Sequence, residues 1–231
     1  MTSVAEVFEL PLPPTLRRTP SYVARIPMSD TQFIGWDHGN RLADWVDGEA
    51  YVYMTTTNEH ERILMFLTQL FGGFCTVTGA GVIRRGPFAM RGRPGGSIRE
   101  PDLLFVAAAN IHRITESQLV GPADLVIEVV SADSPARDRR SKFREYEAAG
   151  VPEYWIIDSR PRRRKADFYV LHDGPAGGQY RAAPLTESGL FRSTVLPEFV
   201  LDPAWLWSDE RSALQCVADM LGPERLMAAL G

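Results

Sequence analysis

Two short apolar runs, 103 to 106 and, apart from one glutamate, 125 to 130, constrain the fold of this 231-residue chain more than any other feature. Apolar runs of this length without polar alternation are typical of strands covered on both faces. A third run, 154 to 157, is rich in aromatic and β-branched residues and has the same character. The sequence therefore predicts an α/β (α+β) fold in which buried strands form the centre of a sheet.

Turn and cap residues place helices and strands before the first buried run. Asp47-Gly48, between segments rich in Trp, Val and Tyr, predicts a hairpin within residues 42 to 54. Thr57 or Asn58 can cap a following helix, which we expect to end at Gly72-Gly73. Strands are then predicted within residues 74 to 91.

Similar signals organise the rest of the chain. Ser134 and Pro135 predict the start of a helix, and Gly150 followed by Val151 predicts its end in a Schellman motif. Further strands are predicted at 166 to 171, 179 to 183 and 194 to 200, and a C-terminal helical segment at 208 to 230 with a break at Gly222-Pro223. We divide the chain into an N-terminal extended arm (1–41), a main domain (42–207) and C-terminal helices of the same domain (208–231).

Charge and cysteine content narrow the class of protein. The chain has 25 basic and 29 acidic residues, a net charge of −4, which excludes a strongly basic nucleic-acid binder. Two cysteines cannot form a disulfide framework or a zinc site alone, which favours a reducing compartment. No signal peptide or membrane span is evident, so we expect a cytoplasmic protein without a membrane partner.

Lysine is rare in this chain, since 23 of its 25 basic residues are arginine and only Lys142 and Lys165 are lysine. A sequence that uses arginine almost everywhere raises the question of whether either lysine is chemically required. Lysine is a compact cation whose pKa can shift, whereas the guanidinium is permanently charged.

One carboxylate stands inside a buried strand. Glu128 interrupts the apolar run at 125 to 130, and an ionised group there is costly unless it is paired, hydrogen-bonded or bound to metal. An ion pair with an arginine is one explanation. The other is that Glu128 and Asp102, at the start of the neighbouring strand, share a divalent cation.

Several motifs occur in a specific order: Gly48-Glu49, His60 at a helix start, Pro101-Asp102, PADLVIEVVS at 122 to 131, and DRRSKFREYEAAGVPEYWIID at 138 to 158. This pattern resembles the Uma-two family of restriction endonucleases, within the PD-(D/E)xK nuclease superfamily, over roughly residues 42 to 171. The resemblance implies a restriction-endonuclease-like core, with a central mixed sheet flanked by helices.

The resemblance also implies roles for individual residues. Asp102 and Glu128 would hold Mg²⁺ or Mn²⁺, with the backbone carbonyl of Val129 or of Val130 as a further ligand, and Glu49 would be the upstream acid. The superfamily lysine two residues after Glu128 is replaced here by Val130, and Lys142 on the following helix would take its place. The implied activity is hydrolysis of DNA phosphodiesters, with Lys142 orienting water or offsetting charge in the transition state.

Three alternatives remain open. Lys142 can instead form a surface ion pair with Asp138, four residues earlier on the same helix. Tyr146, one turn beyond Lys142, and His60 can line the site or serve only packing and helix capping. The chain can also be a catalytically inactive binding or assembly module that keeps the nuclease scaffold.

Two arginine clusters flank the expected site and can contact nucleic-acid phosphates or form solvated faces. They comprise Arg137, Arg139, Arg140 and Arg144, and Arg160, Arg162, Arg163, Arg164 and Lys165. An apolar stripe near the C-terminus (Leu214, Val217, Met220, Leu221 and Leu226) fits either a homodimer interface or docking within the chain.

Overall fold

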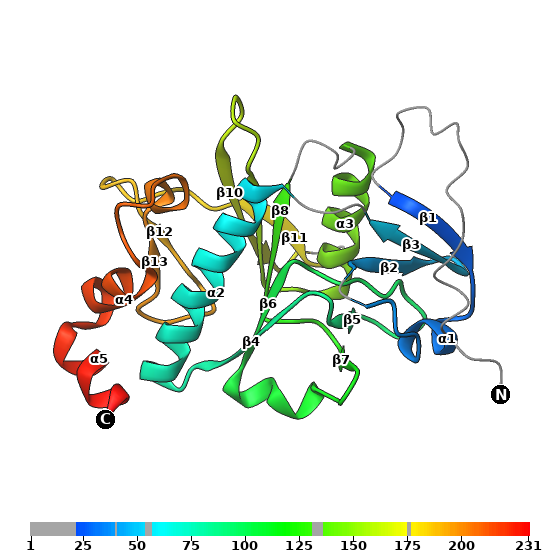
Figure 1. The fold of residues 1–231 in the computed structure, drawn as a ribbon, viewed down its shortest axis with the longest axis horizontal. Coiled ribbons are helices and arrows are strands. Elements are labelled where there is room, and N and C mark those ends of the chain that lie inside the picture. Colours follow the sequence, from blue (N-terminus) through cyan, green and yellow to red (C-terminus); the bar gives the residue numbers. More distant parts are fainter. Residues whose placement is uncertain (1–21, 40, 54–56, 131–135, 175–176) are drawn as a thin grey trace.

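The computed structural model describes residues 22–39, 41–53, 57–130, 136–174 and 177–231 (Figure 1). Its centre is a six-stranded sheet with the strand order β11-β10-β9-β8-β6-β4. Strands β8 and β9 run parallel, and the other neighbouring pairs are antiparallel. The central mixed sheet that the family resemblance implies is therefore confirmed. Its strands are β4 (Gly81–Arg85), β6 (Leu103–Ala107), β8 (Leu125–Val130), β9 (Glu153–Asp158), β10 (Lys165–His172) and β11 (Gln179–Ala182).

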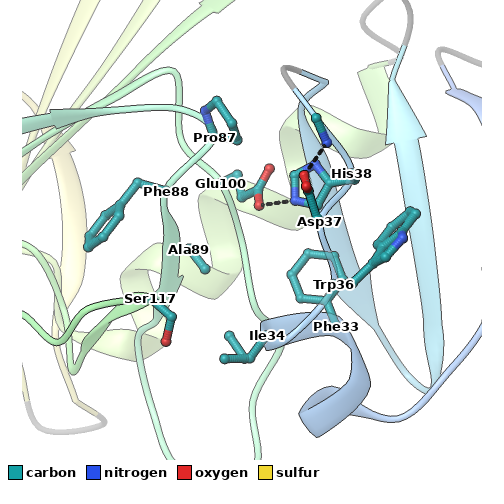
Figure 2. A pocket seen from close by; sticks show the side chains of 11 residues that line it. Phe33, Ile34, Trp36, Asp37, His38, Pro87, Phe88, Ala89, Glu100 and Ser117 are labelled. Carbon is teal, nitrogen blue, oxygen red and sulfur yellow. Dashed lines mark hydrogen bonds and ion pairs between the residues drawn. The ribbon is translucent and has the colours of Figure 1, made fainter. Parts of the chain in front are cut away.

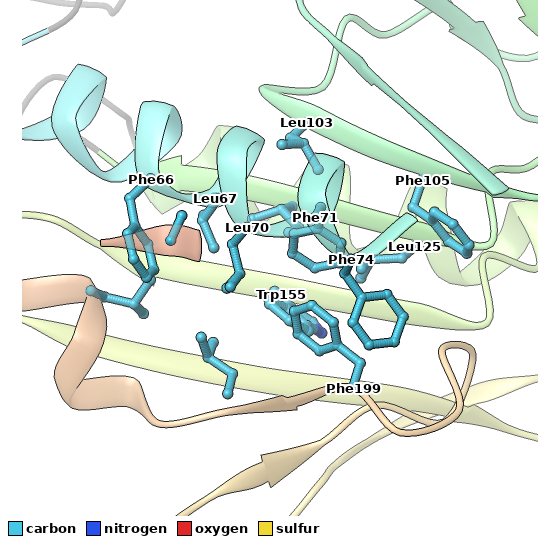
Figure 3. Close-up of a cluster of buried hydrophobic side chains, with 14 of the residues drawn as sticks. Phe66, Leu67, Leu70, Phe71, Phe74, Leu103, Phe105, Leu125, Trp155 and Phe199 are labelled. Carbon is cyan, nitrogen blue, oxygen red and sulfur yellow. The ribbon is translucent and has the colours of Figure 1, made fainter. Parts of the chain in front are cut away.

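Successive side chains of each central strand point to opposite faces of the sheet, and a helix covers each of these two faces. Helix α2 (Asn58–Thr78) covers the face that carries Leu103, Ile127 and Trp155 (Figure 3). Helix α3 (Ala136–Ala149) packs Tyr146 against the opposite face, which carries Leu104, Val126 and Tyr154. Burial on two sides explains why β6 and, apart from Glu128, β8 consist of apolar residues without polar alternation.

A second, three-stranded sheet contains the hairpin predicted at Asp47-Gly48. Strands β2 (Ala43–Val46) and β3 (Glu49–Tyr53) pair antiparallel, and Asp47 and Gly48 both have positive φ, 49° and 87°. From residue 22 onward, the segment expected to be an extended arm forms β1 (Tyr22–Pro27), which pairs with β3, and α1 (Asp30–Ile34). Phe33 of α1 is buried with Ala50 and Val52 of the hairpin.

The predicted end of α2 at Gly72-Gly73 is wrong. The helix runs on to Thr78 and stops at Gly79, whose φ of 66° is the left-handed cap conformation. Phe74 continues the apolar spacing and is buried in the core, so the strand expected from residue 74 begins only at Gly81. Helix α4 (Ala213–Leu221) packs on α2 at Gly73, where a Cβ atom would lie 3.3 Å from a methyl group of Val217. This tertiary contact explains a glycine inside a continuous helix.

The two glycines of α2 predict opposite responses to substitution. A Cβ at Gly72 would meet only Ile83, at 3.9 Å, so Gly72→Ala should raise the free energy of unfolding by about 0.5–1 kcal/mol through helix propensity. Gly73→Leu must displace α4 and should lower it by roughly 1–3 kcal/mol. Urea unfolding of both variants measures the difference. Equal effects of both substitutions would contradict the α2–α4 contact.

The end of α3 agrees with the predicted Schellman motif, since Val151 N donates to Tyr146 O and Gly150 N to Glu147 O. Its expected start at Ser134 and Pro135 lies outside the described residues. The prediction of a strand at 194 to 200 is wrong over most of its length. The strands of this region are β12 (Phe191–Arg192) and β13 (Val200–Leu201), which overlap the predicted range only at residue 200. The remaining elements are β5 (Ala89–Arg91), β7 (Gln118–Val120) and the 3₁₀ segments η2 (Ala108–Arg113) and η3 (Pro203–Trp207).

The C-terminal helical segment is split at Gly222 as expected, into α4 and α5 (Pro223–Leu230). It begins at Ala213 rather than at residue 208, because the side chain of Ser212 caps the helix by accepting from Gln215 N. Val217 and Leu221 of the apolar stripe are buried in the main core, so this stripe docks within the chain. Within the described residues, no helix combines the length and apolar character needed to cross a membrane.

Candidate active site

The structure brings the two predicted acids together. Residue 102 immediately precedes β6, and the antiparallel register that pairs Leu103 with Ile127 sets Asp102 beside Glu128 of β8. Asp102 Oδ2 accepts a hydrogen bond from Val129 N at 2.7 Å. The two residues are only 5% and 9% exposed. The arrangement is a buried pair of carboxylates, one on β8 and the other directly before β6.

Lys142 reaches this pair from α3. Its Nζ lies 3.1 Å and 3.0 Å from the two carboxylate oxygens of Glu128. Tyr146, one helical turn later, donates its hydroxyl to Glu128 Oε1 at 2.7 Å, so both side chains meet the same carboxylate. Tyr146 is thus both a core residue and part of the site. The alternative partner of Lys142, Asp138, has a side chain outside the described part of the chain.

Burial dominates the electrostatics of Glu128. Together with the nearby carboxylates of Asp102 and Asp44, burial raises the pKa of Glu128 to about 7, against the opposing charge of Lys142. A carboxyl group in this range changes its protonation state near neutral pH. Such perturbed groups in a cluster are typical of functional sites.

Asp44 is a third acid of the cluster, which sequence reasoning missed. It lies in β2, is 1% exposed, and its Oδ2 is 3.7 Å from Lys142 Nζ. The same oxygen accepts from Tyr53 OH at 2.7 Å and from Arg99 at 2.8 Å. Burial opposes ionisation of Asp44, but Lys142 and Arg99 outweigh it and lower its pKa. The signal available in the sequence was the position of Asp44 among the apolar residues of a short predicted hairpin strand.

Arg99 connects Asp44 to α3. It makes two charge-assisted hydrogen bonds to Glu145, at 2.8 Å and 2.6 Å, next to Tyr146 in sequence. Arg99 therefore links Asp44 of the hairpin to Glu145 of α3, the helix that carries Lys142. Arg99 gave no signal in the sequence beyond its place before Glu100-Pro101-Asp102.

His60 contacts the other carboxylate. Its Nε2 lies 3.2 Å from Asp102 Oδ2, while Thr57 caps the start of α2 at His60 N. Burial opposes protonation of the imidazole, but the carboxylate of Asp102 outweighs this effect and raises the pKa of His60. Both interpretations of His60 therefore hold: the residue is part of the capped start of α2, and its side chain lines the site.

Glu49 lies elsewhere among the described contacts. It stands in β3, where it pairs with Arg25 and accepts from Tyr51 OH at 3.2 Å. No contact in the described residues joins it to Asp102, Glu128 or Lys142. Asp44, five residues earlier on the partner strand, occupies the position beside Lys142.

The arginine clusters are partly neutralised by ion pairs. Asp158 pairs with Arg160 and lies 3.9 Å from Arg139, and Arg164 lies 3.0 Å from a carboxylate oxygen of Glu59. Arg140 and Arg144 are exposed on α3. These contacts do not support a nucleic-acid surface that uses both clusters in full.

The titration of Glu128 predicts a specific pH dependence in metal-free protein. Unfolded Glu128 releases its proton near its usual pKa of 4.5, whereas folded Glu128 keeps it to about pH 7. The folded state therefore binds more protons between these values, and this group's stabilising contribution is lost as pH rises from 4.5 to 7. Glu128→Gln removes this loss, so its free energy of unfolding relative to wild type should rise by roughly 1–3 kcal/mol across that range.

Urea unfolding in EDTA at a series of pH values measures the effect. Glu116→Gln, at an exposed position, is the control and should follow wild type at every pH. A constant difference between Glu128→Gln and wild type across the range would contradict the raised pKa.

The mixed sheet and the two helices on its faces are those of a restriction-endonuclease-like protein. The chain matches the Uma2 (Uma-two) family, described as "Putative restriction endonuclease", over residues 31–204, and it belongs to that family. A solved structure described as a "putative nuclease belonging to DUF820" from Anabaena variabilis ATCC 29413 shares the fold. It has a TM-score of 0.60 and 14% sequence identity, over 78% of this chain and 98% of that one. A comparison with curated proteins found no match.

Proposed function

We propose that this protein is a metal-dependent endonuclease that hydrolyses phosphodiester bonds in DNA. The observation that carries the proposal is that Asp102 directly before β6, Glu128 of β8 and Lys142 of α3 meet in one buried cluster. Membership of the Uma2 family supports a nuclease function. DNA as substrate and hydrolysis as reaction are the proposal's own additions.

The donor set fits Mg²⁺ or Mn²⁺. Both ions prefer oxygen ligands, and Asp102 and Glu128 supply carboxylate oxygens. Among the described residues, no group of three or more His, Cys, Asp and Glu side chains is arranged to hold a metal, so a backbone oxygen and water molecules would complete the ligand set of the two acids. When bound, the ion would polarise the phosphoryl oxygen and lower the pKa of a water molecule.

The backbone of β8 favours Val129 over Val130 as that further ligand. The carbonyl of Val130 already accepts two hydrogen bonds from Ser159, at 3.0 Å from its N and 2.9 Å from its Oγ. The N–H of Val129 points to Asp102, and the N–H and C=O of one strand residue point to the same side. The Val129 carbonyl is therefore directed to the same side as Asp102.

The protein side chains have separable tasks in this proposal. Lys142 supplies a positive charge beside Glu128, where negative charge accumulates on a pentacovalent phosphorus. Tyr146 holds Glu128 and His60 holds Asp102, which fixes both carboxylates before substrate arrives. Asp44, itself held by Arg99, limits the movement of the Lys142 amine. Glu49 is proposed to have only a minor part in metal binding or catalysis, since its described contacts are with Arg25 and Tyr51.

Exposed arginines of α3 are the proposed phosphate contacts. Arg140 and Arg144 stand on the helix that carries Lys142. Their contribution would be local, in keeping with the net charge of −4 of the whole chain.

Plasmid cleavage and calorimetry test the proposed function together. Wild-type protein should nick supercoiled plasmid with Mg²⁺ or Mn²⁺ and not with EDTA, and Mn²⁺ should bind at micromolar to millimolar concentrations. Metal binding without cleavage of DNA or RNA would support the metal site at Asp102 and Glu128 and overturn the nuclease activity. Neither metal binding nor cleavage would favour the inactive binding module.

A further inference from the structure

A cavity of about 250 Å³ is lined in part by Glu100, two residues before Asp102, and takes no part in the chemistry described above. One wall is formed by residues 33 to 39, from α1 and the loop after it, and the other by residues 87 to 89 and Ser117 (Figure 2). Glu100 and His38 meet between the two walls, with Nε2 of His38 3.0 Å from Glu100 Oε1. Its volume is below that of sites for drug-sized ligands, so the occupant is a smaller group.

The lining restricts the chemistry of that group. Phe33 is buried and Phe88 packs against a neighbouring core cluster, so Trp36, which is half-buried, is the aromatic residue of the lining that favours a planar, partly apolar ligand. The acidic residues Asp37 and Glu100 are hydrogen-bond acceptors, and the lining contains neither lysine nor arginine. A phosphate group is therefore disfavoured, whereas a ring that carries amino donors is favoured.

A metal ion does not fit this cavity. Both ring nitrogens of His38 are already engaged, Nδ1 with Arg41 O at 2.8 Å and Nε2 with Glu100. Glu100 Oε2 also accepts from Ala43 N at 2.8 Å. In the described residues, no group of three or more His, Cys, Asp and Glu side chains is arranged to hold a metal, and this includes the residues that line the cavity.

Glu100, which lines the cavity, is also the residue that relates it to the carboxylate centre. Glu100 precedes Asp102 by two residues, a span of about 7 Å in extended chain, or about two stacked base steps of one DNA strand. Glu100 N also donates to Asp44 Oδ1 at 2.9 Å, and the other oxygen of Asp44 lies 3.7 Å from Lys142 Nζ. A nucleotide at the carboxylate centre would thus have a neighbouring base within reach of the cavity.

We propose that the cavity between residues 33–39 and 87–89 binds an unstacked, amino-bearing nucleobase of the nucleic-acid strand held at the carboxylate centre. This inference rests on the nucleic-acid substrate proposed above. Trp36 supplies stacking surface, and Asp37, with Oδ1 held by Gly39 N at 2.9 Å, accepts from the amino group of cytosine, adenine or guanine. Thymine has a carbonyl where cytosine has an amino group, so the cavity discriminates against it.

Binding in EDTA tests the cavity independently of hydrolysis. The probes are fluorescent single strands of about twelve nucleotides: oligo-dC, oligo-dT and an abasic strand of equal length, followed by fluorescence anisotropy. Wild-type protein should bind oligo-dC about tenfold more tightly than oligo-dT, and both more tightly than the abasic strand. Trp36→Ala should weaken binding of both base-bearing strands about tenfold and leave the abasic strand unchanged.

Asp37→Asn is the second variant, since an asparagine oxygen can keep the bond to Gly39 N. It should remove the preference for oligo-dC while keeping the affinity for oligo-dT. Leu185→Ala, at an exposed apolar position outside the cavity, is the control and should bind as wild type does. Thermal melting confirms that each variant is folded.

The outcomes separate the two proposals. Trp36-dependent preference for base-bearing strands in a protein that never cleaves DNA would support the cavity and overturn the hydrolysis. Cleavage by a protein that binds abasic and base-bearing strands equally would overturn the cavity alone. Absence of binding to all three strands would also overturn the cavity, as would equal weakening of all three by Trp36→Ala.

Discussion

Asp102→Ala should lower the rate of plasmid cleavage at least 100-fold, which corresponds to about 2.7 kcal/mol or more of transition-state stabilisation. The substitution removes one of two carboxylates from the centre. It also leaves Val129 N and His60 Nε2 without the acceptor that each has in the wild-type protein. Calorimetry of the same variant should show that Mn²⁺ binding is lost or weakened by at least tenfold.

Two further variants keep this prediction specific. Asp102→Asn preserves shape and one acceptor oxygen, so it should fold as wild type does and still lose activity. Asp167→Ala, on β10, removes an aspartate whose described partner is the exposed Lys165, and it should cleave at the wild-type rate. Unchanged cleavage by folded Asp102→Ala protein would refute the assignment of the site.

Lys142→Met should have an effect of similar size on cleavage, at least 100-fold, because the ammonium group that faces both oxygens of Glu128 is lost. Lys142→Arg should recover less than about a tenth of wild-type activity, since the planar guanidinium cannot replace a compact ammonium in a site bounded by Glu128, Asp44 and Tyr53. Single-turnover cleavage rates measure both effects.

The second lysine of the chain is the matched control. Lys165 is 69% exposed and pairs with Asp167, so Lys165→Met and Lys165→Arg should both cleave at close to the wild-type rate. Full activity of Lys142→Arg would show that any positive charge suffices there. Full activity of Lys142→Met would remove this residue from the mechanism.

Lys142→Met should also change stability in a pH-dependent way. Loss of the cation leaves a buried carboxylate without its compensating charge and raises the pKa of Glu128 further, so the folded state is destabilised most strongly above pH 7, where wild-type Glu128 is ionised. Below pH 4.5 the carboxyl group is protonated in folded and unfolded protein, so the variant and wild type should differ least. Urea unfolding across this range measures the difference.

Local sequence signals were sufficient wherever neighbouring residues decide the conformation. The hairpin followed from Asp47-Gly48, the Schellman end of α3 followed from Gly150, and β6 and β8 followed from their apolar runs. Where a distant element intervened, local signals failed. The end of α2 was placed at Gly72-Gly73 because glycine weakens a helix, but α4 packs against Gly73 and supports the helix up to Thr78.

The site shows the same division. The burial cost of a charge inside an apolar strand points to Glu128, and the rarity of lysine points to Lys142, from the amino-acid sequence alone. Asp44 was missed because its proximity to Lys142 depends on how the hairpin docks against α3. Glu49, only five residues away, differs from Asp44 in strand and in partners.

The sequence by itself determined that this chain folds around buried strands and that a carboxylate within them requires a partner. It did so because hydrophobic burial and the cost of desolvating a charge are properties of residue type and spacing. Only the tertiary structure decided which groups surround Glu128 and which residues line the cavity at Glu100. Contacts between residues tens of positions apart depend on strand register and helix docking, and these are set by packing of the whole core rather than by any local pattern.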